Sequence, residues 1–391
     1  MADTLIVAAG DHGEAFGEHG EYAHSIFVYD TTLHVPLLMR GPGIPAGTRV
    51  TEPVTLADVG PTVMHALGAP MTGVDGIDLS PAFARAPLPQ RELYAESFAP
   101  LVEFGWAPLR AVRSGAWKLI AAPTTELFNV DADPGEQTNA MAAQPSVAQR
   151  LAGRVDRYSS DSLNANGSSV NSDAAERLRA LGYSSGSSGS SQLSALNSQR
   201  PDPKNRRELA ARIAQVLSGE LSGAPLTAAL EGIVREDPRN GQAQLRLGYA
   251  RLQAGDCTRA EPAFHAAAAA GLPGADVYLG LATCLGRRGD LAAAERALGE
   301  ARRIEPDNPI VIANLGLLQA SKGDLPAAIK SLSAALAADP GLDEARFNLA
   351  IAYAKSGRRA DAATAARELL ARLPATAPQR SEVERLLRTV Q

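Results

Sequence analysis

The sequence contains little cysteine, few aromatic residues and no long apolar run. Only Cys257 and Cys284 occur among 391 residues. Two thiols cannot form the disulfide framework of a small secreted module, so we expect both to be small buried residues. No apolar run approaches the roughly 18 to 20 residues of a membrane span, and Met1 is followed by no apolar signal core. No membrane span is predicted, and no targeting signal can be identified.

The sequence also has no large excess of positive or negative residues. The chain has 38 lysines and arginines against 43 aspartates and glutamates, a formal net charge of −5. This balance gives no general attraction to nucleic acid or anionic lipid, so we expect no nucleic-acid partner. The contents of 45% apolar and 21% charged residues are typical of globular proteins, and the length allows two or three domains.

Composition divides the chain into three zones, 1–150, 151–204 and 205–391. The middle zone is rich in serine, glycine and asparagine, which cannot bury enough apolar area to offset the entropy of ordering. It predicts a flexible linker. One island at 173–182 has helical spacing and a terminal glycine, which predicts a short helix within the linker.

Four series of residues recur every 34 positions in the last zone. They are small residues (Gly248, Ala282, Gly316, Ala350), glycines (Gly255, Gly289, Gly323, Gly357), alanines (Ala260, Ala294, Ala328, Ala362) and prolines (Pro238, Pro306, Pro340, Pro374, with Pro273 one residue out of register). Each unit divides at its glycine into two amphipathic helices, and neighbouring units must stack to cover their apolar faces. We expect about four full repeats over 241–374, preceded by a degenerate helical pair at 205–237 and followed by a capping helix at 378–390.

This pattern resembles the tetratricopeptide repeat family. The resemblance implies an all-α solenoid whose concave groove binds a protein partner; a dimerisation or spacer element is the alternative. No aromatic or basic stripe identifies a ligand, because the repeats are rich in alanine and contain only Phe264 and Phe347 as phenylalanines.

Histidines are concentrated in the first zone, where five of the six precede residue 66. Residues 3–9 predict a buried, parallel-type strand, and Asp11 and His12 follow its carboxyl end, where open α/β sheets build their sites. A carboxylate beside an imidazole suits a divalent cation. Taken alone, the Asp-His-Gly run is also compatible with a turn that carries surface histidines.

The residues that surround the Asp-His-Gly run favour the cation site over the surface turn. Residues 6–14 and 16–20, His24 and residues 29–43 resemble the sulfatase branch of the alkaline phosphatase superfamily. Further matches at 56–62, 73–79, 117–120 and 126–136 extend the resemblance to about residue 140. It implies the carboxy-terminal portion of a sulfatase, an α/β fragment with an incomplete alkaline phosphatase-like sheet, joined to the solenoid.

The resemblance also implies roles for individual residues. Asp11 and His12 would be ligands of a divalent cation, with calcium as first choice and manganese or magnesium as alternatives. His24 would face the transferred sulfuryl or phosphoryl group. His19 would either share that pocket or bond a loop carbonyl, and Glu14 would either orient His12 or be a solvated carboxylate.

Three further residues are interpreted as structural. Lys118 lies in a predicted strand, and we expect a surface or edge position for it. His34 and His65 lie within apolar segments and are expected to pack there.

Sulfatases use a formylglycine nucleophile made from the cysteine or serine of a Cys/Ser-x-Pro-x-Arg motif. This motif is absent from the sequence. We therefore expect the nucleophile to lie in a segment upstream of this sequence and the chain alone to be inactive. Because Asp11 and His12 supply only two ligands, we also expect weak binding of calcium in isolation.

Two classes of function remain open. The first is part of a metal-dependent sulfuric ester hydrolase acting on a sulfate ester. A phosphodiesterase or phosphonate hydrolase of the same superfamily, acting on a phosphate ester, is its nearest alternative. The second class is a non-catalytic tetratricopeptide-repeat scaffold. The sequence leaves the compartment open; the resemblance is compatible with a periplasmic or extracellular parent protein.

Overall fold

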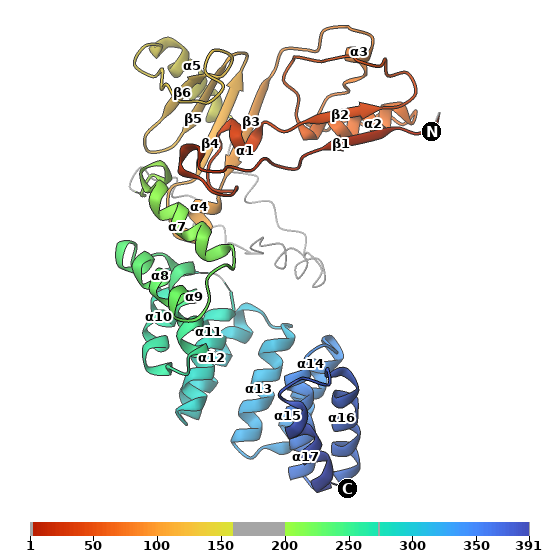
Figure 1. Ribbon diagram of the computed structural model, residues 1–391, viewed down its shortest axis with the longest axis vertical. Helices are drawn as coiled ribbons and strands as arrows, with labels where there is room; N and C mark the ends of the chain where they lie inside the picture. Colours follow the sequence, from red (N-terminus) through yellow and green to blue (C-terminus); the bar gives the residue numbers. More distant parts are fainter. Residues whose placement is uncertain (1–2, 159–199, 273, 391) are drawn as a thin grey trace. The chain divides into compact units, whose positions relative to one another are not determined.

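The computed structural model describes residues 3–158, 200–272 and 274–390 (Figure 1). They divide into two compact units, Met1–Leu221 and Ser222–Gln391. The short helix expected at 173–182 lies outside the described residues. None of the described helices is long and apolar enough to cross a membrane.

The core of the first unit is a four-stranded antiparallel meander covered by one helix. Gly115, with φ of 58°, begins the tight connection between the second and third strands, a conformation that glycine adopts without strain. Val112, Leu119 and Leu127 are fully buried in the cluster that includes the covering helix. The elements are β3 (Glu92–Ser97), β4 (Leu109–Ser114), β5 (Trp117–Ala121), β6 (Glu126–Asn129) and the helix α5 (Pro145–Val155).

A second sheet contains β1 (Ile6–Ala9) and β2 (Leu37–Arg40), which pair antiparallel with Ile6 opposite Arg40. Ile6 is 42% exposed and Leu38 is 63% exposed. The prediction of a buried, parallel-type strand at residues 3–9 was therefore wrong. A short apolar run carries no information on the direction of its partner, and this partner comes later in the chain and runs the opposite way.

Short helices complete the first unit. They are η1 (Glu18–Gly20), α1 (Asp30–Leu33), η2 (Leu56–Asp58), α2 (Val59–Ala66), α3 (Ser80–Phe83), α4 (Ala99–Phe104), η4 (Pro203–Arg206) and α7 (Arg207–Leu217). The last two begin at Pro203, at the end of the predicted linker zone, and belong to the first unit. Asp202 explains this attachment, because its carboxylate accepts Thr124 N at 2.8 Å and pairs with Lys204 Nζ at 2.9 Å. The unit boundary thus falls after α7, which the sequence analysis assigned to the solenoid zone.

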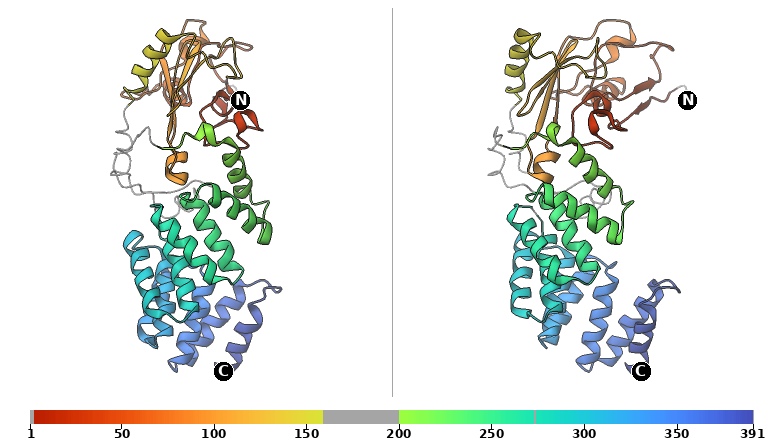
Figure 2. Two further views of the ribbon diagram at one scale, coloured as in Figure 1. Left: turned by 90° about the vertical axis from the view of Figure 1, so that its left-hand side faces the viewer. Right: turned by 60° about the vertical axis from the view of Figure 1, so that its left-hand side comes forward.

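The second unit is a stack of antiparallel helix pairs, which Figure 2 shows in two views. Its helices are α8 (Gly223–Glu236), α9 (Gly241–Gln253), α10 (Cys257–Ala269), α11 (Asp276–Arg287), α12 (Leu291–Ile304), α13 (Pro309–Ser321), α14 (Leu325–Ala338), α15 (Asp343–Lys355), α16 (Arg359–Arg372) and α17 (Arg380–Val390). The expected fold class is confirmed: small sheets come first and helical repeats follow. A helix also lies where the sequence predicts a capping helix.

The 34-residue period has a direct physical basis in the turns. The recurring glycines between paired helices have φ of 79° to 87°, a left-handed conformation that other residues rarely adopt. In three repeats the next residue is an aspartate whose side chain accepts a backbone N–H of the following helix, at Asp256, Asp290 and Asp324. The small residues allow close packing: a Cβ on Gly248 would lie 2.6 Å from Phe264, which is fully buried.

Candidate functional site

The candidate site is the loop that follows β1, residues 10–24. Gly13 N donates to Thr32 O at 2.8 Å, and a Cβ at Gly13 would lie 2.3 Å from Thr31 O, so this position requires glycine. Ala15 N then donates to Ala23 O at 2.9 Å. This bond joins the two limbs of the loop and brings residue 24 back beside residues 12 and 14.

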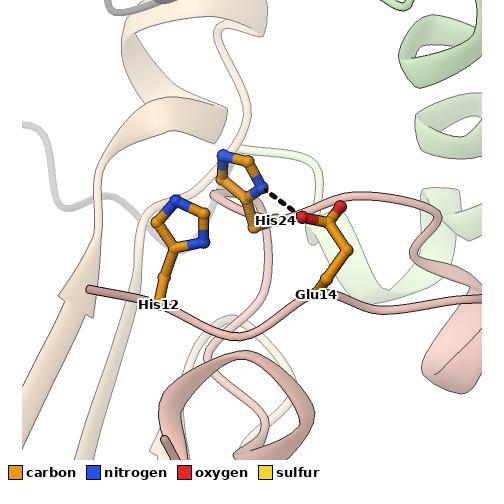
Figure 3. A group of neighbouring side chains, drawn as sticks. All are labelled: His12, Glu14 and His24. Atoms are coloured by element: carbon orange, nitrogen blue, oxygen red, sulfur yellow. Dashed lines mark hydrogen bonds and ion pairs between the residues drawn. The ribbon is translucent and has the colours of Figure 1, made fainter. Parts of the chain in front are cut away.

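His12, Glu14 and His24 form one group of side chains, shown in Figure 3. The imidazole rings of His12 and His24 are stacked, with centroids 3.8 Å apart. His24 Nδ1 lies 3.1 Å from Glu14 Oε2. One possible ligand atom from each residue lies within 4.8 Å of the others, and the side chains are 34% to 44% exposed. The three donors are therefore accessible to an ion from solvent.

Asp11 contacts His12 but lies outside that group. Its Oδ1 accepts His12 N at 3.1 Å, and its Oδ2 lies 3.7 Å from His12 Nε2. A carboxylate oxygen and an imidazole nitrogen are both donors that divalent cations accept, so Asp11 and His12 would hold such an ion together. The donor set fits the divalent cation that the resemblance implies. The role of Asp11 and His12 as its ligands stays a prediction.

His19 lies apart from the group. Its Nε2 is 3.1 Å from Gly135 O, and its ring stacks on Tyr29 with centroids 3.6 Å apart. Burial lowers the pKa of His19, and the nearby Arg207 lowers it further. Of the two roles that the sequence suggested for His19, the contact with a loop carbonyl is present in the structure. The catalytic role of His19 remains a prediction.

Helix α7 fixes the distal turn of the loop. Arg207 Nη2 donates to the hydroxyl of Tyr29 at 2.9 Å, and that hydroxyl donates to Glu126 Oε2 at 2.8 Å. A Cβ on Gly20 would lie 2.8 Å from Arg207 Cβ, so the helix packs directly on the loop backbone. A segment far along the chain thus helps to position the candidate site.

Lys118 is not a surface residue, and that prediction was wrong. It is 2% exposed, and its Nζ lies 2.6 Å from Asp30 Oδ1 and 2.8 Å from Glu136 Oε1. Glu136 Oε2 in turn accepts Asp30 N at 2.5 Å. Burial raises the pKa of Glu136, and the ammonium of Lys118 opposes that effect. The lysine is buried because two distant carboxylates neutralise it.

The interpretation of His34 and His65 as packing residues was also wrong. Both side chains are exposed, because the apolar segments that contain them lie at the surface. His65 Nδ1 lies 3.2 Å from Asp78 Oδ2, so it forms a surface pair.

Glu21 was not identified from the sequence. It is 4% exposed, and its Oε1 accepts Ile26 N at 3.0 Å and Phe27 N at 3.2 Å. Burial raises the pKa of Glu21 to about 7, against the lowering effect of these two hydrogen bonds. The sequence signal was weak, since one acidic residue in a polar loop gives no indication of burial.

Several curated proteins resemble the first part of the chain. Human arylsulfatase K is 31% identical over 164 residues, which cover 39% of this chain and 30% of that protein. Choline-sulfatase from Rhizobium meliloti (strain 1021) is 35% identical over 145 residues, which cover 36% of this chain and 27% of that protein. The chain thus spans about 30% of the length of these relatives.

Solved structures resemble the helical part. The Cut9–Hcn1 hetero-tetramer of APC/C is 20% identical with a TM-score of 0.41, covering 46% of this chain and 35% of that one. A thermophilic tetratricopeptide-repeat protein of Thermus thermophilus is 23% identical with a TM-score of 0.40, covering 46% and 97%. Residues 1–69 match the sulfatase family model, and residues 245–309 and 319–389 match tetratricopeptide repeat models. The chain therefore joins a sulfatase-like segment to a tetratricopeptide-repeat segment.

Proposed function

We propose that the sulfatase-like segment supplies the metal-binding part of a sulfuric ester hydrolase. The contact between Asp11 and His12, with the ring of His24 stacked on His12, is the observation that carries this proposal. It gathers three of the residues that the family resemblance singles out on one loop. The matches to arylsulfatase K and choline-sulfatase support sulfate esters as the substrate class.

Each residue has a distinct task in this proposal. Asp11 and His12 would hold a divalent cation, which would supply charge stabilisation at an ester oxygen. His24 donates a hydrogen bond to the oxyanion or the leaving oxygen. Glu14, whose Oε2 lies 3.1 Å from His24 Nδ1, orients that ring.

The nucleophile comes from elsewhere in this proposal. The 391 residues contain no Cys/Ser-x-Pro-x-Arg motif. The chain alone is inactive and requires a segment that carries formylglycine. The tetratricopeptide repeats bind a protein partner, consistent with the stacked helix pairs of the second unit. A phosphodiester is the second substrate class, because the histidine beside Asp11 stands where arylsulfatases commonly have asparagine.

The test is hydrolysis of a chromogenic aryl sulfate, choline sulfate and an aryl phosphodiester, each with Ca²⁺ or Mn²⁺. The full chain is assayed alone and after mixing with a formylglycine-bearing segment of an arylsulfatase. We expect hydrolysis only in the mixture. Asp11→Asn and His12→Gln should abolish this activity, and the control His34→Gln should retain it. Activity of the chain alone would contradict the missing nucleophile, and inactivity in every mixture would favour the scaffold.

A further inference from the structure

The two cysteines of the sequence lie on neighbouring helices of the solenoid. Cys257 is the first residue of α10, and Cys284 lies in the last turn of α11. Both are free thiols, and the two thiols are hydrogen-bonded to each other. We propose that Cys257 and Cys284 form a reversible disulfide bond that links α10 of one repeat to α11 of the next. This inference is independent of the hydrolase proposal, because both cysteines belong to the second unit.

Close packing of the two helices holds the cysteines at the same interface. Phe264 follows Cys257 by two helical turns on α10, and Gly280 precedes Cys284 by one turn on α11, so each pair shares one face of its helix. A Cβ on Gly280 would lie 2.3 Å from Phe264 Cζ, so the backbone of α11 approaches α10 closely. A disulfide needs Cα atoms about 4.4–6.8 Å apart, which such a close approach allows.

The apolar core fixes this interface. Phe264 and Cys284 are fully buried in one cluster, and Cys257 packs against that cluster from its edge. Side chains in a closely packed core keep their positions, because a shift of one of them opens a cavity or a clash. The two sulfur atoms are therefore in contact before any reaction, and bond formation requires only a small movement of the partly exposed Cys257.

The two thiols differ in their access to solvent, and this difference sets the order of reaction. Cys257 is partly exposed, whereas Cys284 is fully buried. Burial, the contact with Cys257 and the nearby Glu261 raise the pKa of Cys284 to about 12, against a lowering effect of Arg287. The thiolate is the reactive form, so a buried thiol with a raised pKa reacts slowly with a reagent from solvent. Cys257 therefore reacts first, and Cys284 completes the bond.

The oxidant in this proposal is a small-molecule disulfide, with oxidised glutathione as the probe. The thiolate of Cys257 attacks one sulfur of that disulfide, which breaks its S–S bond and releases one small thiolate. Cys284 then loses its proton, and its sulfur attacks the sulfur of Cys257 and releases the second small thiolate. The two protein thiols lose two electrons, and the small disulfide is reduced to two thiols that take up the two protons.

The test is equilibration of the full chain in glutathione buffers from mostly reduced to mostly oxidised, followed by alkylation of free thiols and mass spectrometry. We expect one disulfide within the chain, between Cys257 and Cys284, which persists in about a tenfold excess of reduced glutathione. The solenoid should unfold at a higher temperature when oxidised, because the bond restricts the unfolded chain. The first unit contains no cysteine and should unfold at the same temperature in both states.

Serine variants test the order of reaction. Cys284→Ser should retain one glutathione on Cys257, because no second thiol can displace it. Cys257→Ser should take up none, because the remaining thiol is buried. Circular dichroism shows whether each variant is folded, and the unmodified chain gives the main result in either case.

The inference is overturned if both thiols stay free in the most oxidising buffer, or if Cys257 pairs only with glutathione or with a second chain. A disulfide that lowers the unfolding temperature of the solenoid would also overturn it, because the helices would then not be placed for the bond. Uptake of glutathione by Cys257→Ser would reverse the assigned order. These readouts are thiol chemistry and unfolding, so they do not depend on whether the chain takes part in ester hydrolysis.

Discussion

The two units of this chain are stabilised by interactions of very different sequence range. In the solenoid, the side chain of Asp290 caps a helix by accepting the N–H of Ala293, three residues away. In the first unit, Lys118 pairs with Asp30 over 88 positions, and His19 meets Gly135 over 116 positions. Local interactions repeat and leave a period in the sequence, whereas distant ones leave none.

The same difference separates the consequences of mutation. A change in the solenoid alters one repeat and its immediate neighbours, because stability there is a sum of repeat and interface contributions. A change in the first unit can remove the partner of a buried charge far along the chain. The predictions below measure the two units separately, by calorimetric unfolding of the full chain.

The largest effect is expected for Lys118→Met. The substitution leaves Asp30 and Glu136 without their shared cation, and Glu136 is only 2% exposed. Removing one partner of a buried ion pair costs about 3–5 kcal/mol. We expect the free energy of unfolding of the first unit to fall by this amount, so that its transition moves to lower temperature. The transition of the solenoid should stay at the same temperature.

Lys322→Met is the matched control, because its Nζ pairs with Glu295 at 2.6 Å on the exposed surface of the solenoid. An exposed pair contributes about 0–1 kcal/mol. Equal effects of the two substitutions would contradict the contrast between buried and exposed charge.

Lys118 also shows the limit of what the sequence could predict. The strand containing it was recognised, but its burial depends on Asp30 and Glu136, which lie in other segments. The solenoid was predictable because its glycines, alanines and capping aspartates recur in one register. The antiparallel direction of β1 was not predictable, because pairing with β2 depends on the path of the intervening chain.

The candidate site was predictable only in part, because some of its residues are brought together by contacts that leave no pattern in the sequence. The sequence selected His12 and His24, both on the loop that the structure brings together. It gave Glu14 only as an ambiguous neighbour of His12, because the bond between Ala15 and Ala23 that places it beside His24 has no sequence signature. The burial of Glu21 and the contact of Arg207 with Tyr29 were not predicted, since both depend on tertiary packing.

The second prediction concerns the pH dependence of the first unit. The pKa of Glu21 is about 7 in the folded chain and near the ordinary glutamate value of about 4.3 when unfolded. The Glu21 carboxyl therefore stays protonated to a higher pH in the folded state than in the unfolded state. The stability that the neutral carboxyl contributes to the first unit is fully present below about pH 4.3 and is lost as the pH rises to about 7. Glu21→Gln stays neutral, and its Oε1 can still accept both backbone N–H groups.

We therefore expect Glu21→Gln to stabilise the first unit at pH 8 by up to about 3 kcal/mol, with little change at pH 4.5. Thermal unfolding of parent and variant between pH 4.5 and 8 measures this difference. Glu52→Gln removes an exposed carboxylate of the same unit and is the control. If Glu21→Gln stabilised the first unit equally at pH 4.5 and pH 8, the cost of burying the charged Glu21 carboxylate would not explain the stabilisation.

The third prediction compares two glycines of helix α11. A Cβ on Gly280 would lie 2.3 Å from Phe264 Cζ, and Phe264 is fully buried, whereas a Cβ on Gly286 would meet nothing within 4 Å. Gly280→Ala should destabilise the solenoid by about 1–3 kcal/mol through overpacking. Gly286→Ala should stabilise it by about 0.5–1 kcal/mol, because alanine favours the helix. Effects of the same sign would contradict the close approach at Gly280.

The smallest effect tests the local character of the solenoid. Asp290→Ala removes the bond to Ala293 N at 3.0 Å and should cost about 1 kcal/mol, while Asp290→Asn should change stability by only a few tenths because asparagine caps helices equally well. The fourth repeat has Arg358 at the equivalent position, where its guanidinium lies 4.4 Å from the ring of Tyr353. One repeat thus forms without this cap, so the aspartate tunes stability and does not define the fold. A loss well above 2 kcal/mol in Asp290→Ala, or a shift of the first unit, would mean that the cap has effects beyond its own repeat.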